Sequence, residues 1–407
     1  MPAIVIVGAG ECGTRAAFAL REEGWDGRIV LVGTEPPYER PPLSKTGEYK
    51  LICGGAALSE AGITFLPGVE ATGLDTAGHA LELADGRRLA YRSLLLATGA
   101  RARRLPFGGA PVHLLRGHAD SAALRAKLAP GRRVAVIGGG FIGLELAASA
   151  AALGCRVTVV ELGPRLMGRG VPARVAAVMA GRHVRMGVDI RCGTGVTGLA
   201  ETASGVTITL AEGTAIEADV VVAGVGAVPE TSLAWAAGIE TADGVVVDAR
   251  FATSAADVFA AGDCCRYPHP LYDGRLLRLE SWRAAQEHGA AAARAMLGGT
   301  QLNGVEPYAG VPWFWSDQHG YTLQVAGLAA AADREVVRVR PDGVEVWFGL
   351  ADGGRLVAAA AAGPGNSVAR DIRLAEMLIA RRAAPDPAVL ADPGAALKSV
   401  LRAPVAG

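Results

Sequence analysis

The amino-acid sequence predicts an α/β fold, in which two modules built on glycine-rich turns precede a strand-rich α+β domain at the C-terminus. Its 407 residues exceed the length of one ordinary domain, and its 55 glycines and 51% hydrophobic residues are typical of helices packed closely onto sheets. A glycine-rich turn follows a short β-branched run twice. From about residue 307, short alternating runs replace the helical pattern.

Charge and cysteine spacing argue against several classes of function. Lys+Arg and Asp+Glu number 40 each, so the overall charge predicts neither nucleic acid nor an acidic membrane surface as a partner. The first residues lack a basic leader and the apolar stretches are short, so we expect a cytoplasmic protein without a membrane span. The six cysteines have no CxxC spacing, so we expect no metal site and most of them to be small buried residues.

The first module is predicted as a strand at residues 3–7, a helix at 14–23 and a second strand at 29–32. The turn carries the fingerprint glycines Gly8, Gly10 and Gly13. One glycine permits the sharp turn, one the close approach of a pyrophosphate, and one helix–strand packing, while the helix N-terminus attracts the phosphates. An acid after the second strand would bind ribose hydroxyls. Glu35 is the nearest acid, because Thr34 occupies the expected position.

The second module repeats this pattern from residue 133 to residue 161. A strand at 134–137 leads into the glycines Gly138, Gly140 and Gly143. A helix at 144–153 and a strand at 156–160 follow, and Glu161 ends that strand 23 residues after the first glycine. An acid at about this offset binds a ribose 2′-hydroxyl and repels a 2′-phosphate, so the pattern favours NADH over NADPH.

The remaining segments complete the predicted domain order. Buried strands are expected near residues 94–96 and 220–228, where the chain leaves each nucleotide domain, and at 258–263. Asp263 lies at the end of the last of these strands. It is expected either to accept a hydrogen bond from a ribityl hydroxyl of FAD or to cap the N-terminus of a following helix. The C-terminal part ends in a helix at about 367–382. We therefore divide the chain into a first FAD segment, an NAD domain, a second FAD segment and a β-rich domain, at residues 1–109, 110–236, 237–306 and 307–407.

Five further motifs carry a resemblance to a known family. They are YERPPLSK at residues 38–45, ATG at 97–99, VFAAGD at 258–263, ESW at 280–282 and PWFWSDQ at 312–318. With the two fingerprints, they resemble the FAD-dependent NADH:ferredoxin reductases that serve bacterial ring-hydroxylating dioxygenases and some cytochromes P450. The resemblance covers the whole chain. It implies the glutathione-reductase fold, in which an NAD domain is inserted into an FAD domain.

The resemblance also implies the site residues. For FAD they are Gly8, Gly10, Cys12, Gly13, Arg40, Lys45, Ala71, Ala97, Thr98, Gly99, Arg116, Asp263 and Trp282, with Thr34 or Glu35 for the adenosine ribose. For NADH they are Gly138, Gly140, Phe141, Ile142, Gly143, Glu145, Glu161, Arg169, Gly226 and Glu280. Lys45, Glu280 and Trp315 are the candidate catalytic residues. The sequence departs from the family pattern at Thr34, where an acid is usual, and at Ala285, where an asparagine is usual.

These residues predict an electron-transfer enzyme that uses no protein nucleophile. It would take hydride from NADH onto FAD and pass single electrons to an iron–sulfur partner, a [2Fe-2S] ferredoxin or a rubredoxin, which feeds a dioxygenase or a cytochrome P450 in aromatic hydrocarbon catabolism. Lys45 would stabilise negative charge on the flavin. Alternatively, Lys45 and Arg40 are surface cations, although a polyproline-II-like Pro41-Pro42 is an unusual setting for an ordinary helix surface. Trp313 and Trp315, which share one face of a strand, are alternatively core residues.

Other functions stay open on the same scaffold. A disulfide reductase would need a cysteine pair after the first module, where only Cys53 lies, whereas a peroxide or oxygen reductase could use Cys53 alone. A non-enzymatic flavoprotein that senses NADH is a third hypothesis. The adjacent Cys264 and Cys265 are a redox pair or, more simply, two buried thiols. The histidines show no ligand-like clustering, so we expect isolated structural or surface residues.

Overall fold

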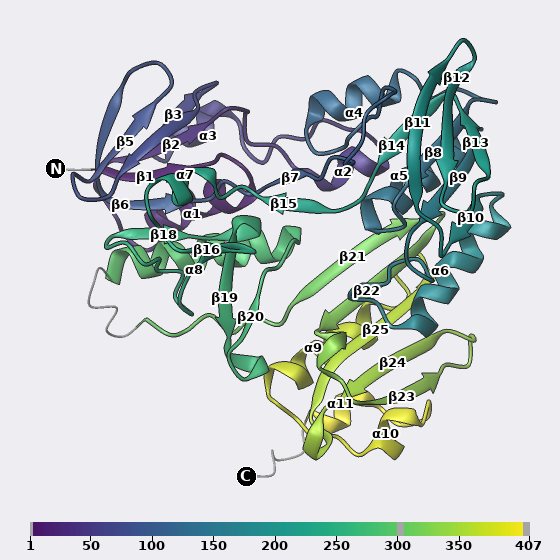
Figure 1. The fold of residues 1–407 in the computed structure, drawn as a ribbon. Helices are drawn as coiled ribbons and strands as arrows, with labels where there is room; N and C mark the ends of the chain where they lie inside the picture. Colours follow the sequence, from purple (N-terminus) through teal and green to yellow (C-terminus); the bar gives the residue numbers. More distant parts are fainter. Residues whose placement is uncertain (1–2, 299–304, 402–407) are drawn as a thin grey trace. The chain divides into compact units, whose positions relative to one another are not determined.

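The computed structural model describes residues 3–298 and 305–401 and contains two compact units (Figure 1). The first comprises Met1–Glu39, Tyr49–Arg101 and Val228–Gly310, and the second comprises Arg40–Glu48, Ala102–Ala227 and Val311–Gly407. Residues 1–2, 299–304 and 402–407, which belong to the predicted FAD and C-terminal domains, lie outside the described residues. None of the helices in the described part combines the length and apolar character needed to cross a bilayer.

The first unit is built on a sheet whose central strands are buried on both faces. Parallel strands run in the order β3 (Ile63–Pro67), β2 (Ile29–Gly33), β1 (Ala3–Val7) and β6 (Arg88–Leu96), and β18 (Val258–Ala260) also pairs with β6. Antiparallel β5 (Ala80–Leu83) and β4 (Ala71–Asp75) extend the sheet. Because helices cover parallel sheets, β1 and β2 read as continuous apolar runs.

Helix α1 (Glu11–Glu22) packs against α8 (Trp282–Gly298), and small residues make this close approach possible. A side chain at Gly289 would overlap the carbonyl oxygen of Cys12. The unit also contains the short helices α3 (Gly55–Glu60) and α7 (Ser232–Ala236) and the 3-10 turns η1 (Gly262–Cys264) and η2 (Pro270–Tyr272). A small sheet of β16 (Thr241–Ala242), β17 (Gly244–Val246), β19 (Cys265–His269) and β20 (Arg275–Leu277) completes it.

The second unit repeats the parallel arrangement. Its sheet has the order β10 (Asp189–Cys192), β9 (Arg156–Glu161), β8 (Arg133–Ile137) and β14 (Val220–Ala223). Helices α4 (His118–Arg125), α5 (Phe141–Ala152) and α6 (Ala173–Arg185) accompany this sheet, and β11 (Val196–Thr202), β12 (Gly205–Leu210) and β13 (Ala215–Ala218) form an antiparallel layer. The short helix α2 (Pro41–Lys45) contacts α5. Two linking strands, β7 (Ala100–Ala102) and β15 (Ala227–Pro229), pair with each other.

The C-terminal part of this unit is a five-stranded antiparallel sheet. Its order is β21 (Trp313–Gln318), β22 (Tyr321–Gly327), β25 (Leu356–Pro364), β24 (Glu345–Leu350) and β23 (Arg334–Val339). Helix α9 (Ala369–Ala380) packs on β22 and β25, and α10 (Pro387–Ala391) and α11 (Leu397–Val400) follow, with short turns η4 (Ala329–Ala331) and η5 (Asp352–Gly354) between strands. Leu323, Val325 and Trp347 share one apolar core with α5 and α6. This shared core brings β21 next to α5.

The predicted fold class is confirmed: two parallel-sheet modules of Rossmann type and a strand-rich C-terminal α+β part are all present. One local prediction is wrong, because Pro41 and Pro42 form the first turn of α2 and not a polyproline-II segment. Proline is favoured at a helix start, where its ring fixes a helical φ and its missing N–H would have no partner.

Candidate functional site

The glycine turn of the first unit has the shape of a pyrophosphate cradle. Gly8 has a φ of 110°, and a Cβ there would overlap the carbonyl oxygen of Ala97. A Cβ at Gly13 would overlap the carbonyl oxygen of Gly8, whereas a Cβ at Gly10 would meet no atom within 4 Å. The first and third glycines are therefore required by packing. The second faces open space beside the N-terminus of α1, where the N–H groups favour an anion.

Several predicted FAD residues surround this cradle. Ala97 contacts Gly8, Ala261 donates to Leu96, and Gly262 contacts Cys12, so the turn at 97–99 and Asp263 lie next to the glycine loop. Thr98 donates its hydroxyl to the backbone of Glu230, 2.6 Å away. Asp263 is part of η1 and a strand follows it, so the alternative that it caps a helix is wrong.

The acid at the end of β2 is held in place by a neighbouring phenol. Tyr38 donates to the carboxylate of Glu35 at 2.9 Å, and Thr34 is exposed beside it. Ala71 begins β4, two residues after Val69, whose N–H bonds the carbonyl of Gly33. The chain thus gathers Thr34, Glu35 and Ala71 near the carboxyl end of one strand.

A carboxyl group inside the first glycine loop was missed in the sequence. Glu11 is the first residue of α1 and accepts a hydrogen bond from Gln286 on α8, at 2.7 Å. Burial raises the pKa of Glu11, although the hydrogen bond from Gln286 and the nearby side chain of Trp282 oppose this rise. The signal for it was an acidic residue placed between two fingerprint glycines.

The glycine turn of the second unit repeats the same design. Gly138 has a φ of 105°, and a Cβ there would overlap the carbonyl oxygen of Gly224. A Cβ at Gly143 would overlap the carbonyl oxygen of Gly138, whereas the nearest atom to a Cβ at Gly140 is 4.0 Å away. Phe141 and Ile142 follow as the first residues of α5, and the side chain of Phe141 packs on Phe314. This turn is therefore a second cradle.

Glu161 lies at the edge of the second cradle. Its carboxylate accepts the backbone N–H groups of Gly139 and Gly163, both at 2.7 Å. The next arginine along the chain, Arg165, directs its guanidinium to backbone carbonyls between residues 166 and 171. This module therefore holds a fixed carboxylate at the edge of its glycine turn.

Two arginines flank Gly226, which lies between β14 and β15. A Cβ at Gly226 would be 3.3 Å from the guanidinium of Arg169 and 3.9 Å from that of Arg103. The structure thus brings together Arg169 and Gly226, which were both predicted, and adds Arg103, which was not. Arg103 sits in a short basic run, and nothing in its spacing distinguished it from Arg101 and Arg104.

Lys45 is the centre of a charged cluster in the second unit. Its ammonium lies 2.7 Å from Asp317, 3.9 Å from Glu145 and 4.8 Å from the ring centroid of Trp315. Trp315 also donates to Asp317 at 3.0 Å and stacks on Trp313 with ring centroids 5.4 Å apart. Lys45 is therefore no free surface cation. The two tryptophans share a face, as their spacing predicted.

Helix α2 is held rigidly enough to place this lysine. Arg125 and Ser149 both donate to the carbonyl of Lys45, at 2.5 and 2.7 Å, and Ser121 donates to the carbonyl of Leu43 at 2.9 Å. At the other end of the helix, Arg40 donates to the carbonyl of Arg116 at 2.7 Å. The last carbonyls of a short helix are thus satisfied by neighbouring side chains.

Glu145 is the buried member of the cluster, with only 8% of its surface exposed. Ser44 and Ser316 donate to its two oxygens at 2.5 and 2.7 Å. Burial raises the pKa of Glu145, while the charge of Lys45 and the two hydroxyl groups oppose that rise. Burial also acts on Asp317, but the hydrogen bond from Lys45 holds the pKa of Asp317 below its usual range. The cluster therefore pairs one cation with two differently solvated acids.

Glu280 and Trp282 lie in the first unit. The exposed carboxylate of Glu280 forms an ion pair with Arg278, which also contacts Asp243 at 3.2 Å. Trp282 is the first residue of α8, and its side chain helps to lower the pKa of Glu11 against the effect of burial. Ala285, in place of the family's asparagine, is buried in the apolar core.

The expectation of isolated histidines is wrong. His183 and His319 are hydrogen bonded at 3.1 Å, because the turn after β21 packs against α6. His269 and His288 share an aromatic cluster with Tyr267 and Tyr308. Contacts of this kind arise from packing between distant segments and leave no local pattern in a sequence.

None of the six cysteines, all of which lie among the described residues, forms a disulfide. All six are free: Cys12, Cys155, Cys264 and Cys265 are buried, Cys53 is half-buried and Cys192 is exposed. Burial and the charge of Glu11 raise the pKa of the Cys53 thiol, which disfavours a reactive thiolate. Across residues 3–298 and 305–401, His, Cys, Asp and Glu form no group arranged to hold a metal ion.

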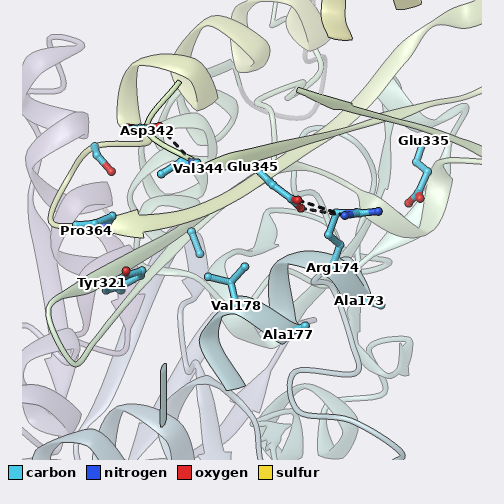
Figure 2. Close-up of a pocket in the computed structure, with 13 residues that line it drawn as sticks. Ala173, Arg174, Ala177, Val178, Tyr321, Glu335, Asp342, Val344, Glu345 and Pro364 are labelled. Atoms are coloured by element: carbon cyan, nitrogen blue, oxygen red, sulfur yellow. Dashed lines mark hydrogen bonds and ion pairs between the residues drawn. The ribbon is translucent and has the colours of Figure 1, made fainter. Parts of the chain in front are cut away.

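A cavity of about 910 Å³ opens elsewhere in the second unit (Figure 2). It lies between α6 and the C-terminal sheet, and Arg174 and Glu345 form an ion pair of 3.1 Å across its wall. None of the predicted site residues lines it.

Comparison with known proteins gives a consistent picture. Residues 2–289 match the family model described as pyridine nucleotide-disulphide oxidoreductase, and residues 313–401 match that described as reductase C-terminal. The chain is 42% identical to the anthranilate 1,2-dioxygenase system ferredoxin–NAD(+) reductase component of Burkholderia cepacia, over 98% of both chains. It is 39% identical to the p-cumate 2,3-dioxygenase system ferredoxin–NAD(+) reductase component of Pseudomonas putida, over 96% of both. The crystal structure of the covalent putidaredoxin reductase–putidaredoxin complex superposes with a TM-score of 0.90 at 33% identity, covering 98% of both chains.

Proposed function

Because this chain belongs to the pyridine nucleotide-disulphide oxidoreductase family, we propose that it is an FAD-containing reductase that takes electrons from NADH and passes them to an iron–sulfur ferredoxin. Its membership of the family confirms the resemblance read from the sequence. The observation that carries the proposal is the pair of glycine cradles, one in each unit, each with an open second glycine. The relatives at 42% and 39% identity are reductase components of dioxygenase systems, which supports a ferredoxin as acceptor.

FAD, when bound, takes an electron pair from NADH and releases the electrons singly. The open face of Gly10 and the first N–H groups of α1 would hold its pyrophosphate, and Glu35, fixed by Tyr38, would take ribose hydroxyls. Lys45 would stabilise negative charge on the flavin, and Asp317 keeps that ammonium oriented.

NADH would occupy the second cradle. Gly140 leaves room for its pyrophosphate, and the fixed carboxylate of Glu161 would accept the 2′-hydroxyl of its adenosine ribose. Arg103 and Arg169 place positive charge beside Gly226, which would attract the negative pyrophosphate of NADH. Glu280 and Trp315 stay candidates for positioning the reacting rings. We also propose the cytoplasm as the site of action, since NADH is supplied there.

The proposed acceptor is a [2Fe-2S] ferredoxin that feeds an oxygenase. Support comes from the relatives named for anthranilate and p-cumate dioxygenase systems and from a solved relative captured with putidaredoxin. Disulfide reduction is not favoured, because the six cysteines are unpaired and those of the first unit are buried or half-buried.

Anaerobic stopped-flow absorbance tests the proposal. The purified yellow protein is mixed with NADH or NADPH, and a [2Fe-2S] ferredoxin is added afterwards. We expect fast loss of flavin absorbance with NADH, little with NADPH, and rapid recovery with ferredoxin. Recovery with peroxide or oxygen but not with ferredoxin would refute the electron-transfer role and leave the cofactors in place.

A further inference from the structure

The buried carboxylate of Glu145 is the end of a chain of side-chain hydrogen bonds within the second unit. Ser316 donates to it at 2.7 Å, and the amide nitrogen of Gln318 lies 2.9 Å from the Ser316 hydroxyl. The Nε2 atom of His183 lies 2.8 Å from the amide oxygen of Gln318. Nδ1 of His183 lies 3.1 Å from Nε2 of His319. The chain thus connects α5, β21, α6 and the turn after β21.

The donors in this chain all point toward Glu145. Because Gln318 uses its NH₂ group toward Ser316, its oxygen faces His183 and accepts a hydrogen bond from the Nε2–H group. The Nδ1 atom of the neutral His183 ring is then an acceptor, so His319 donates to it. Burial lowers the pKa of His183, and burial with neighbouring positive charge lowers the pKa of His319 to about 4. Both rings are therefore neutral near pH 7, each with its proton on Nε2.

The side chains of this hydrogen-bond chain are buried at all but its outer end. Ser316 and His183 are 0% exposed and Gln318 is 1% exposed, while His319 is half-buried at the outer end. Buried polar groups without partners are costly, so a break at one member leaves its neighbour unsatisfied. Arg182 fixes the outer end, because its guanidinium donates to the carbonyl of His319 at 2.8 Å.

The groups that face Glu145 come from two elements besides its own helix. From α2 these are Ser44 and Lys45, and from β21 they are Ser316 and Asp317. Only the Lys45 charge and the two hydroxyl groups favour the ionised carboxylate, whereas burial and the Asp317 charge oppose it. The hydroxyl of Ser316 is thus one of three favourable contacts, and Gln318 and His183 determine its direction.

We propose that His183 and His319 are positioning residues for Glu145, which act through Gln318 and Ser316 to keep its carboxylate ionised and turned toward Lys45. The relevance of this carboxylate to NADH oxidation rests on the proposed function. The hydrogen-bonded chain itself is a property of the folded protein. Breaking this hydrogen-bond chain should raise the pH at which Glu145 loses its proton.

The test compares H183L with the matched variant H183Q, in FAD-loaded protein. Leucine removes the donor to Gln318, whereas the amide of glutamine supplies one at the position of Nε2. Each protein is also made with E145Q added, and the thermal unfolding midpoint is measured across the pH range. The difference between each protein with and without E145Q isolates the titration of Glu145 from that of all other groups.

The sign of the result follows from the raised pKa of Glu145. Stability that is present while the carboxyl is neutral is lost as the pH rises through its folded-state pKa. We expect H183L to move this inflection to higher pH by about half a unit, S316A to move it further, and H183Q to leave it unchanged. An unmoved inflection in H183L and S316A, or an equal movement in H183Q, would overturn the proposal.

A second variant keeps the test decisive if H183L does not fold. His319 has a φ of 51°, which asparagine tolerates, so H319N removes the outermost donor without backbone strain. We expect a smaller shift in the same direction, and no shift would overturn the proposal. The unfolding measurement needs neither NADH nor ferredoxin. Failure of the wild-type protein to oxidise NADH would therefore refute the proposed function and leave this result standing.

Discussion

Replacing Glu161 by glutamine tests the proposed preference for NADH over NADPH. The substitution keeps the size of the side chain and removes its charge. The carboxylate holds two backbone N–H groups at 2.7 Å, and an amide can accept only one of them, because its NH₂ group would face the other. Losing one charge-assisted hydrogen bond weakens the glycine loop by about 1.5–3 kcal/mol, and a neutral amide accepts a ribose hydroxyl less strongly than a carboxylate does, so we expect NADH to bind more weakly.

NADPH should respond in the opposite direction. Two unit charges about 4 Å apart repel by about 1 kcal/mol in water and about 4 kcal/mol near a protein surface, and Glu161 is only half-buried. Removing that repulsion predicts a gain for NADPH of about fivefold to about 900-fold in kcat/KM. The assay is the rate of flavin reduction at a series of concentrations of each nucleotide.

The matched control is Glu35→Gln, the same chemical change at the corresponding position of the first unit. It should weaken FAD retention and leave the ratio of NADH to NADPH rates unchanged. A ratio in Glu161→Gln equal to that of the wild-type protein would refute the reasoning, because it would mean that this carboxylate does not meet the 2′ position.

Three more predictions concern single residues. Gly10→Ala should leave the free energy of unfolding of the FAD-free protein within about 0.5 kcal/mol of wild type but reduce FAD binding, measured by flavin fluorescence, whereas Gly13→Ala should lower the unfolding free energy by more than about 1 kcal/mol because its Cβ overlaps Gly8. Cys53→Ser should reduce ferredoxin at the wild-type rate. A loss of this activity in the variant would support thiol chemistry at Cys53. Burial lowers the pKa of His269 to about 4, so its contribution to stability is present above its ordinary pKa of about 6.5 and declines as the pH falls toward 4. Urea unfolding at pH 7.5 and pH 5 should therefore show an extra loss of about 2 kcal/mol in wild type relative to His269→Gln, and equal losses would contradict the assignment.

The modules were predictable because their signals are local. A glycine fingerprint specifies a strand, a turn and a helix start within a dozen residues, so α1 and α5 were placed correctly apart from their first turns. We expected these helices at residues 14 and 144, and they begin at Glu11 and Phe141, directly after the second glycine of each turn. The helix expected at 367–382 spans Ala369–Ala380. The starts of α1 and α5 were placed three residues late because neither glycine turn has a Ser, Thr, Asp or Asn residue that would mark the helix N-terminus.

The arrangement around Glu145 was not predictable in the same way. Its hydrogen-bond partners Ser44 and Ser316 lie 101 and 171 residues away along the chain, and His183 meets Gln318 across 135 residues. No periodicity links such positions. The family resemblance supplied Glu145 and Lys45 as separate residues, but only the packing of α2 on α5 shows that they share one cluster.

The charges of Glu161 and Glu145, two acids of the same nucleotide module, are stabilised by different groups. Glu161 is half-buried and bonded to two backbone N–H groups, so its charge is stabilised by its own glycine loop. Glu145 is buried in α5, whose own backbone groups are occupied, so its charge depends on side chains from α2 and β21. The C-terminal sheet therefore contributes a polar contact to the nucleotide module as well as apolar packing. By supplying Ser316, it makes an ionised carboxylate tolerable at a position where burial alone would favour the neutral acid.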